Sequence, residues 1–137
     1  MPLKKSSDVP LIRLDQPLNQ AHLFKTIASA LALEIPELTP SLVAQLVMAR
    51  EREGETYIGH GVVILHLISE LVARSSVLLV KAAAPLSWRS RYSGATHQVD
   101  KFVVLAIAPD DVDGAQFRPI MRQLIDEASI RQLFEME

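Results

Sequence analysis

The chain has 137 residues, no cysteine and a formal net charge of -2, and 49% of its residues are hydrophobic. These properties support one domain with a substantial core, and they exclude a disordered chain, a disulfide scaffold and a thiolate metal site. The weak negative charge disfavours nucleic acid as a partner. We therefore expect a single domain over residues 1–137, in which residues 1–8 are flexible.

The N-terminal segment does not resemble a targeting signal. MPLKKSSDVP contains two lysines without an apolar stretch after them, and no run of ~18 uninterrupted apolar residues occurs in the chain. We expect no insertion into a membrane, and a chain without cysteine is compatible with the cytoplasm.

Residues 9–14 predict a short strand, which Pro10 restricts to the edge of a sheet because proline has no N–H group to donate.

Two amphipathic helices are predicted next. Asn19 is the expected N-cap of a helix over about 20–33, in which apolar residues recur at spacings of three and four. Thr39 as N-cap and Pro40 at the first helical position predict a second helix over about 40–53. Each helix has an apolar stripe, so we expect both to cover one face of a sheet.

The strands of that sheet are predicted from three shorter runs rich in branched residues, at 61–67, 75–84 and 100–108. A loop then leads into a helix with Pro119 in its first turn or at a kink, and the ASIRQLFEM segment predicts a short final helix. This order predicts an α/β fold, a single-domain sandwich with a central mixed β-sheet flanked by helices. The three branched runs should be adjacent strands.

Common nucleotide and metal signatures are missing. There is no P-loop, and Ile64 stands where the third glycine of a G-x-G-x-x-G motif would follow Gly59 and Gly61. The four histidines show no i, i+4 pair and no H-x-H spacing. We expect no metal and no cofactor.

His66, at the end of the first predicted buried strand, has two interpretations. It is either a buried histidine whose ring is satisfied by backbone groups, or a nucleophile. The neutral imidazole, with an ordinary pKa of ~6.5, has a free lone pair that can accept a phosphoryl group. The phosphoryl oxygens would need donors, which REREGET supplies as Arg50, Arg52 and Thr56. The same charges would also suit a solvated helix end.

These residues carry a resemblance to a known family. RE at 50–51, Thr56 and IGHGVVILH at 58–66 resemble the active-site segment of the fructose/mannitol/nitrogen-regulatory enzyme IIA family of the bacterial phosphoenolpyruvate-dependent phosphotransferase system. A looser similarity covers most of the chain from about residue 20. The resemblance implies the enzyme IIA mannitol/fructose-like fold, with His66 as the phosphorylated residue and Arg50 as a catalytic cation. Thr56, Gly59 and Gly61 would bind the phosphoryl group, since the glycines let the backbone turn tightly beside a small anion.

The resemblance also implies partners. A histidine-containing phosphocarrier protein would supply the phosphoryl group, and an enzyme IIB component or a regulatory target protein would receive it or respond to it. The chain departs from the family pattern at Leu65, where proline is usual, at Tyr57 in place of glycine, at Val63 in place of alanine, and at Gly114, where many members have a second histidine. Two hypotheses follow: a phosphocarrier, or a non-catalytic regulatory or interaction module with the same fold and a degenerate site.

Overall fold

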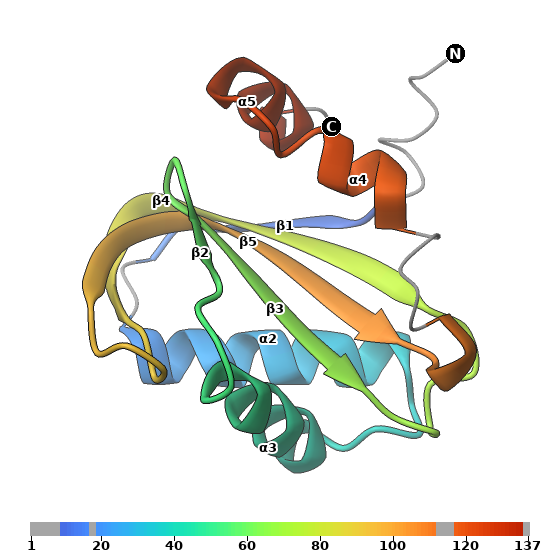
Figure 1. Cartoon of the computed structure of the whole chain (residues 1–137). Helices are drawn as coiled ribbons and strands as arrows, with labels where there is room; N and C mark the ends of the chain where they lie inside the picture. The colour runs from blue at the N-terminus through green and yellow to red at the C-terminus, as the bar shows by residue number, and fades with distance from the viewer. Residues whose placement is uncertain (1–8, 17–18, 112–116, 136–137) are drawn as a thin grey trace.

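The computed structural model describes residues 9–16, 19–111 and 117–135, which form helices on both faces of one five-stranded sheet (Figure 1). The strands are β1 (Leu11–Leu14), β2 (Tyr57–Gly59), β3 (Val62–Ile68), β4 (Ser76–Arg89) and β5 (Thr96–Ile107). The helices are α2 (Gln20–Glu34), α3 (Pro40–Glu51), α4 (Arg118–Arg122) and α5 (Glu127–Glu135), with a 3-10 turn at Pro109–Asp111.

The sheet is mixed, as predicted, and its order is β1-β4-β5-β3-β2. β4 and β5 are antiparallel, whereas β3 is parallel to β5 and β1 is parallel to β4. The three branched runs are therefore adjacent strands at the centre. β1 lies at an edge, as Pro10 predicts, and the carbonyl of Pro10 accepts a hydrogen bond from the N–H of Leu79.

Helices α2 and α3 cover one face of the sheet (Figure 1). The side chains of Asn19 and Thr39 cap them by accepting hydrogen bonds from the N–H groups of His22 and Leu42. The apolar stripes of both helices pack on alternate residues of β3, β4 and β5. The two predicted helices and the face they share are confirmed, and α3 ends two residues before the expected position.

Helices α4 and α5 lie over the opposite face, against a smaller buried cluster (Figure 1). Pro119 lies in the first turn of α4, where its missing N–H costs no helical hydrogen bond. None of the helices in the described ranges is long and apolar enough to cross a lipid bilayer.

The structure differs from the sequence prediction in the β4–β5 hairpin and at β2. β4 continues past Pro85 to Arg89, and the pairing with β5 shifts its register between Lys81 and Leu86, which accommodates the proline. Beyond the shift, Leu86 and Trp88 are buried. The strand β2 was not predicted, because three residues beside a turn are too few to show a period of two.

Candidate functional site

His66 lies near the end of β3, opposite Leu105 of the parallel strand β5. Its neighbours Leu65 and Leu67 are buried against the α2/α3 side of the sheet. Because successive side chains of a strand alternate between faces, His66 projects toward the other face, the side of α4. On its outer edge β3 pairs with β2 only at Val62 and Val63, so that edge is not covered by β2 at His66.

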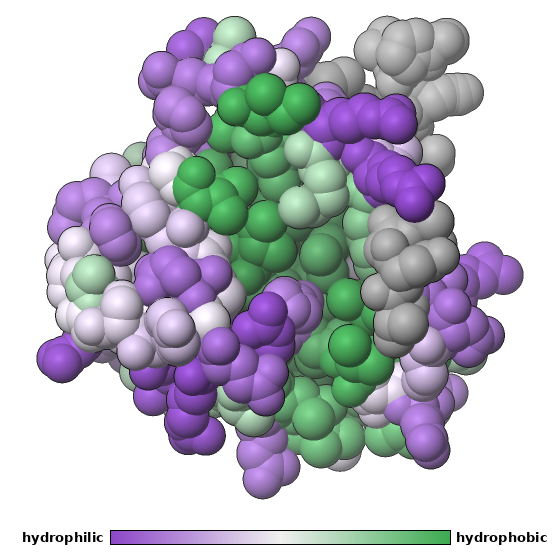
Figure 2. Space-filling model, in the orientation of Figure 1, coloured by the Kyte–Doolittle hydropathy of each residue, from purple (hydrophilic) through white to green (hydrophobic). Residues whose placement is uncertain are grey.

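Two hollows meet at His66, and Arg50 lines both of them. The larger hollow has a volume of about 290 Å³ and is bounded by β3, β5 and α4. Its lining residues are Arg50, Glu55, Thr56, Ile58, Ile64, His66, Leu105, Ile107, Phe117 and Met121. The smaller, of about 210 Å³, lies between α3 and β3. Figure 2 shows that hydrophobic residues gather across this side of the molecule, framed by hydrophilic ones.

The imidazole of His66 is half-buried, and its Nδ1 atom is buried without a hydrogen-bond partner among the described residues. Burial lowers the pKa of His66, and the positive charge of Arg50 lowers it further, whereas Glu53 opposes this shift. Both larger effects favour the neutral ring at neutral pH. The geometry therefore differs from that of a structural histidine with both nitrogens bonded to protein groups.

Glu51 is a buried carboxyl beside this site, and the sequence prediction assigned it no role. Its side chain is only 2% exposed, and its Oε1 accepts a hydrogen bond of 3.0 Å from the hydroxyl of Thr56. Burial raises the pKa of Glu51 to about 7, although Thr56 and Arg50 act in the opposite direction. The signal in the sequence is the spacing, since Glu51 follows Val43 and Val47 at intervals of four on the buried stripe of α3.

The other predicted site residues occupy different places. Thr56 lines the larger hollow, but its hydroxyl donates to Glu51. Gly59 and Gly61 lie in the β2–β3 turn, with φ angles of 97° and 74°, and neither lines a hollow with His66. A Cβ atom at position 61 would lie 3.0 Å from an oxygen of Asp100. The glycines therefore serve the turn, and the structure does not bring them to His66.

The structure also locates most of the positions at which the chain differs from the usual family pattern. Tyr57 accepts a hydrogen bond from the N–H of Gly61 and stacks on His97, with ring centroids 3.9 Å apart. Leu65 and Val63 are fully buried on the α2/α3 side. Gly114 lies outside the residues that the structure describes. Apart from His66, no described histidine lines either hollow.

The arrangement of strands and helices is that of the enzyme IIA domains. The nitrogen regulatory protein IIA-Ntr from Neisseria meningitidis is similar in structure with a TM-score of 0.75 at 19% sequence identity, over 98% of this chain and 92% of that one. IIA mannitol from Escherichia coli is similar with a TM-score of 0.64 at 16% identity, over 95% of this chain and 89% of that one. No curated protein matches the sequence significantly.

Residues 8–137 match the family described as phosphoenolpyruvate-dependent sugar phosphotransferase system, EIIA 2. The chain belongs to this family and is a phosphocarrier domain of the phosphotransferase system.

Proposed function

We propose that His66 accepts a phosphoryl group from a histidine-containing phosphocarrier protein and passes it to an enzyme IIB component or holds it as a regulatory mark. The observation that carries the proposal is a half-buried imidazole where two hollows lined by Arg50 meet, whose Nδ1 has no hydrogen-bond partner among the described residues. In the transfer, a ring nitrogen of neutral His66 attacks phosphorus, and the bond from phosphorus to the ring nitrogen of the donor histidine breaks. The donor ring takes up one proton and leaves as neutral imidazole, while the His66 ring releases the proton of its other nitrogen, so charge and protons balance.

The electrostatics of the site suit this step. Burial and Arg50 keep His66 neutral, so its lone pair is available for attack. As the phosphoryl group arrives, its negative charge comes close to the guanidinium of Arg50, which can bind it through charge-assisted hydrogen bonds. The step needs no metal or nucleotide, because the donor already carries an activated phosphoryl group.

The surroundings of His66 suit a protein donor. Ile58 and Met121 line the larger hollow and Ile68 lines the smaller one, and all three are between 42% and 49% exposed. Such a surface can dock a phosphocarrier or an enzyme IIB component through apolar contacts. We expect these encounters to take place in the cytoplasm.

The proposal is tested by incubating the chain with phosphoenolpyruvate, enzyme I and the phosphocarrier protein, and measuring its intact mass. We expect a gain of one phosphate that is abolished by His66→Ala and retained in His97→Ala, a histidine variant outside the hollows. Loss of phosphorylation in His97→Ala, or its persistence in a folded His66→Ala variant, would assign the acceptor elsewhere.

A second candidate is a binding module of the same fold with a degenerate site. Two observations favour it: no second described histidine lines the hollows, and β3 pairs with β5 without interruption through Leu65 and His66. The variant Leu65→Pro with Gly114→His restores the family's residues. An active carrier should gain rate from this change, whereas an unmodified wild type that becomes phosphorylated only after it would identify a binding module.

A further inference from the structure

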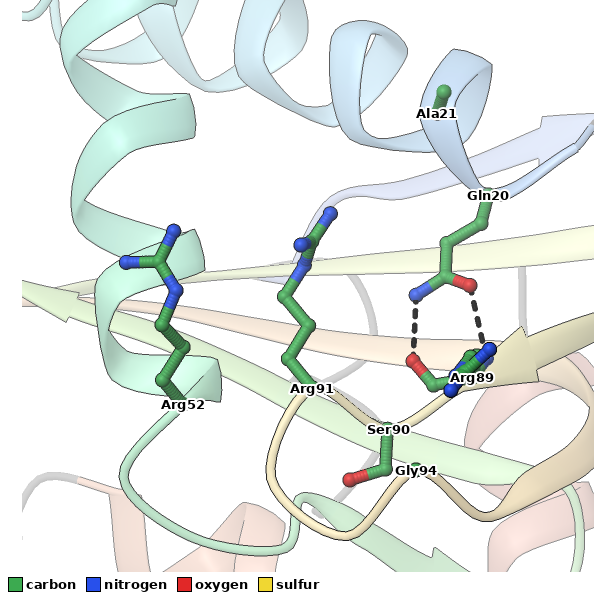
Figure 3. A pocket seen from close by; sticks show the side chains of 7 residues that line it. All are labelled: Gln20, Ala21, Arg52, Arg89, Ser90, Arg91 and Gly94. Atoms are coloured by element: carbon green, nitrogen blue, oxygen red, sulfur yellow. Dashed lines mark hydrogen bonds between the residues drawn. The ribbon is translucent and has the colours of Figure 1, made fainter.

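A pocket separate from His66, the arginine pocket, is lined by Arg52, Arg89 and Arg91. It has a volume of about 490 Å³ and lies where the end of α3, the first turn of α2 and the β4–β5 turn meet. Its lining residues are Gln20, Ala21, Arg52, Arg89, Ser90, Arg91 and Gly94. None of these is acidic, although the chain as a whole has a net charge of -2. Figure 3 shows the side chains of Arg52 and Arg91 extending in the same direction from two different elements.

The wall of this pocket is held in place by specific hydrogen bonds. The side-chain amide of Gln20 donates to the carbonyl of Arg89 at 2.9 Å and accepts from its N–H at 2.8 Å, which ties α2 to the end of β4 (Figure 3). The carboxylate of Glu55 accepts hydrogen bonds from the hydroxyls of Ser90 and Ser93. The turn that carries Arg91 is therefore fixed before any ligand binds, which lowers the entropic cost of binding.

The positive charges in this pocket are not neutralised by ion pairs. In the part of the chain that the structure describes, no carboxylate lies within ion-pair distance of Arg52, Arg89 or Arg91. The Arg91 guanidinium lies 5.7 Å from the centroid of the Phe24 ring. The first N–H groups of α2, at Gln20 and Ala21, have no partner within the helix, and the helix dipole adds positive potential there.

We propose that this pocket binds the phosphate group of a small phosphate monoester. A dianion with three terminal oxygens matches several guanidinium groups and helix N–H groups better than a single carboxylate does. The volume exceeds that of phosphate alone and lies within the range of small-molecule sites, so there is room for an organic group. The binding is independent of phosphotransfer, because Arg50 lines the hollows at His66 and Arg52 lines this pocket.

The test is a titration of the isotopically labelled full chain with glycerol 3-phosphate and with AMP, followed by NMR. We expect saturable shifts of the amide signals of Ala21, Arg91 and Gly94 with at least one monoester, and none with glycerol. The double variant Arg89→Gln with Arg91→Gln should weaken binding by roughly tenfold or more while its spectrum remains that of a folded chain. Arg131→Gln, an exposed arginine of α5, is the matched control and should bind normally.

His66→Ala should also bind both monoesters as the unaltered chain does, which separates this inference from the proposed phosphotransfer. The inference is overturned if no saturable binding occurs, if the double variant binds normally, or if His66→Ala abolishes binding. Tighter binding of a single-stranded oligonucleotide at the same amides would also overturn it and assign the pocket to nucleic acid.

Discussion

The two faces of the sheet differ in how completely they are covered. The cluster of buried residues between the sheet and helices α2 and α3 has more than twice as many described members as the cluster between the sheet and helices α4 and α5. On the α4 side, Ile68 and Met121 remain 49% and 42% exposed, and the larger hollow at His66 opens beside Met121. The comparison indicates that one face contributes most of the core, while the other leaves strand residues partly exposed.

The largest effect that would test this comparison is on stability. Phe102 is fully buried on the α2/α3 side and packs on Trp88, with ring centroids 5.3 Å apart. We expect Phe102→Ala to lower the free energy of unfolding by about 3–5 kcal/mol. The matched change on the open face, Ile68→Ala, should cost less than ~1 kcal/mol, because the side chain is half exposed. Urea denaturation measures both, and similar losses would contradict the comparison.

The next effect concerns the rate of phosphorylation. Replacing Arg50 by Gln removes the charge that the proposed transfer places beside the incoming phosphoryl group, so we expect a loss on the order of 2–4 kcal/mol of transition-state stabilisation. Initial rates of phosphate incorporation at limiting donor concentration measure this loss. The control is Arg52→Gln, two residues further along, which should change the rate by less than about threefold because Arg52 lines the other pocket. Equal effects would mean that general positive charge, and not the position of Arg50, matters.

A third effect is the pH dependence of stability that Glu51 confers. Its pKa is raised from 4.5 to about 7 in the folded chain, so the folded state holds the proton more tightly than the unfolded state. The resulting stabilisation is fully present below pH 4.5 and is lost as pH rises through 7, by an amount on the order of 3 kcal/mol.

Glu51→Gln keeps the acceptor for Thr56 but cannot ionise. Its unfolding free energy should therefore lack this decline between pH 4.5 and 7, as urea denaturation across that range would show. Glu127→Gln, at an exposed position in α5, should retain the decline of the wild type. A decline of the same size in Glu51→Gln would show that another group is responsible.

The smallest expected effect is on the ring of His66 itself. Because Arg50 contributes to the lowered pKa, Arg50→Gln should raise the pKa of His66, although burial will still keep it below the ordinary value. An NMR titration of the imidazole signals measures the shift. Arg52→Gln should leave the titration unchanged, and a shift of equal size in that variant would contradict the assignment of Arg50 as the neighbouring charge.

The central sheet and the first two helices could be predicted because their residues follow simple periods and caps. Asn19 and Thr39 mark helix starts, and the runs of branched residues mark buried strands. The outer part of the β4–β5 hairpin was missed, since Pro85 suggests the end of a strand. The alternation of buried Leu86 and Trp88 with exposed Ser87 and Arg89 was nevertheless present in the sequence.

For the candidate site, the resemblance placed Arg50 and His66 in one site, and both line the same two hollows. It also placed Gly59 and Gly61 in that site, whereas they form the β2–β3 turn. Gly61 lies five positions before His66 along an extended segment, which corresponds to roughly 16 Å. That distance alone keeps the turn away from a phosphoryl group on His66. The arginine pocket was not predicted, because Arg52 and Arg91 are distant in sequence. They line one pocket because the β4–β5 hairpin packs against α2.

The end of α3 brings three consecutive charged residues to three destinations: Arg50 to His66, Glu51 to the interior and Arg52 to the arginine pocket. Neighbouring positions on a helix differ by about 100° in direction, so this division depends on the helical phase. A one-residue insertion anywhere between Pro40 and Arg50 would rotate all three side chains together. Homologues that vary in length are therefore expected to place their insertions outside α3.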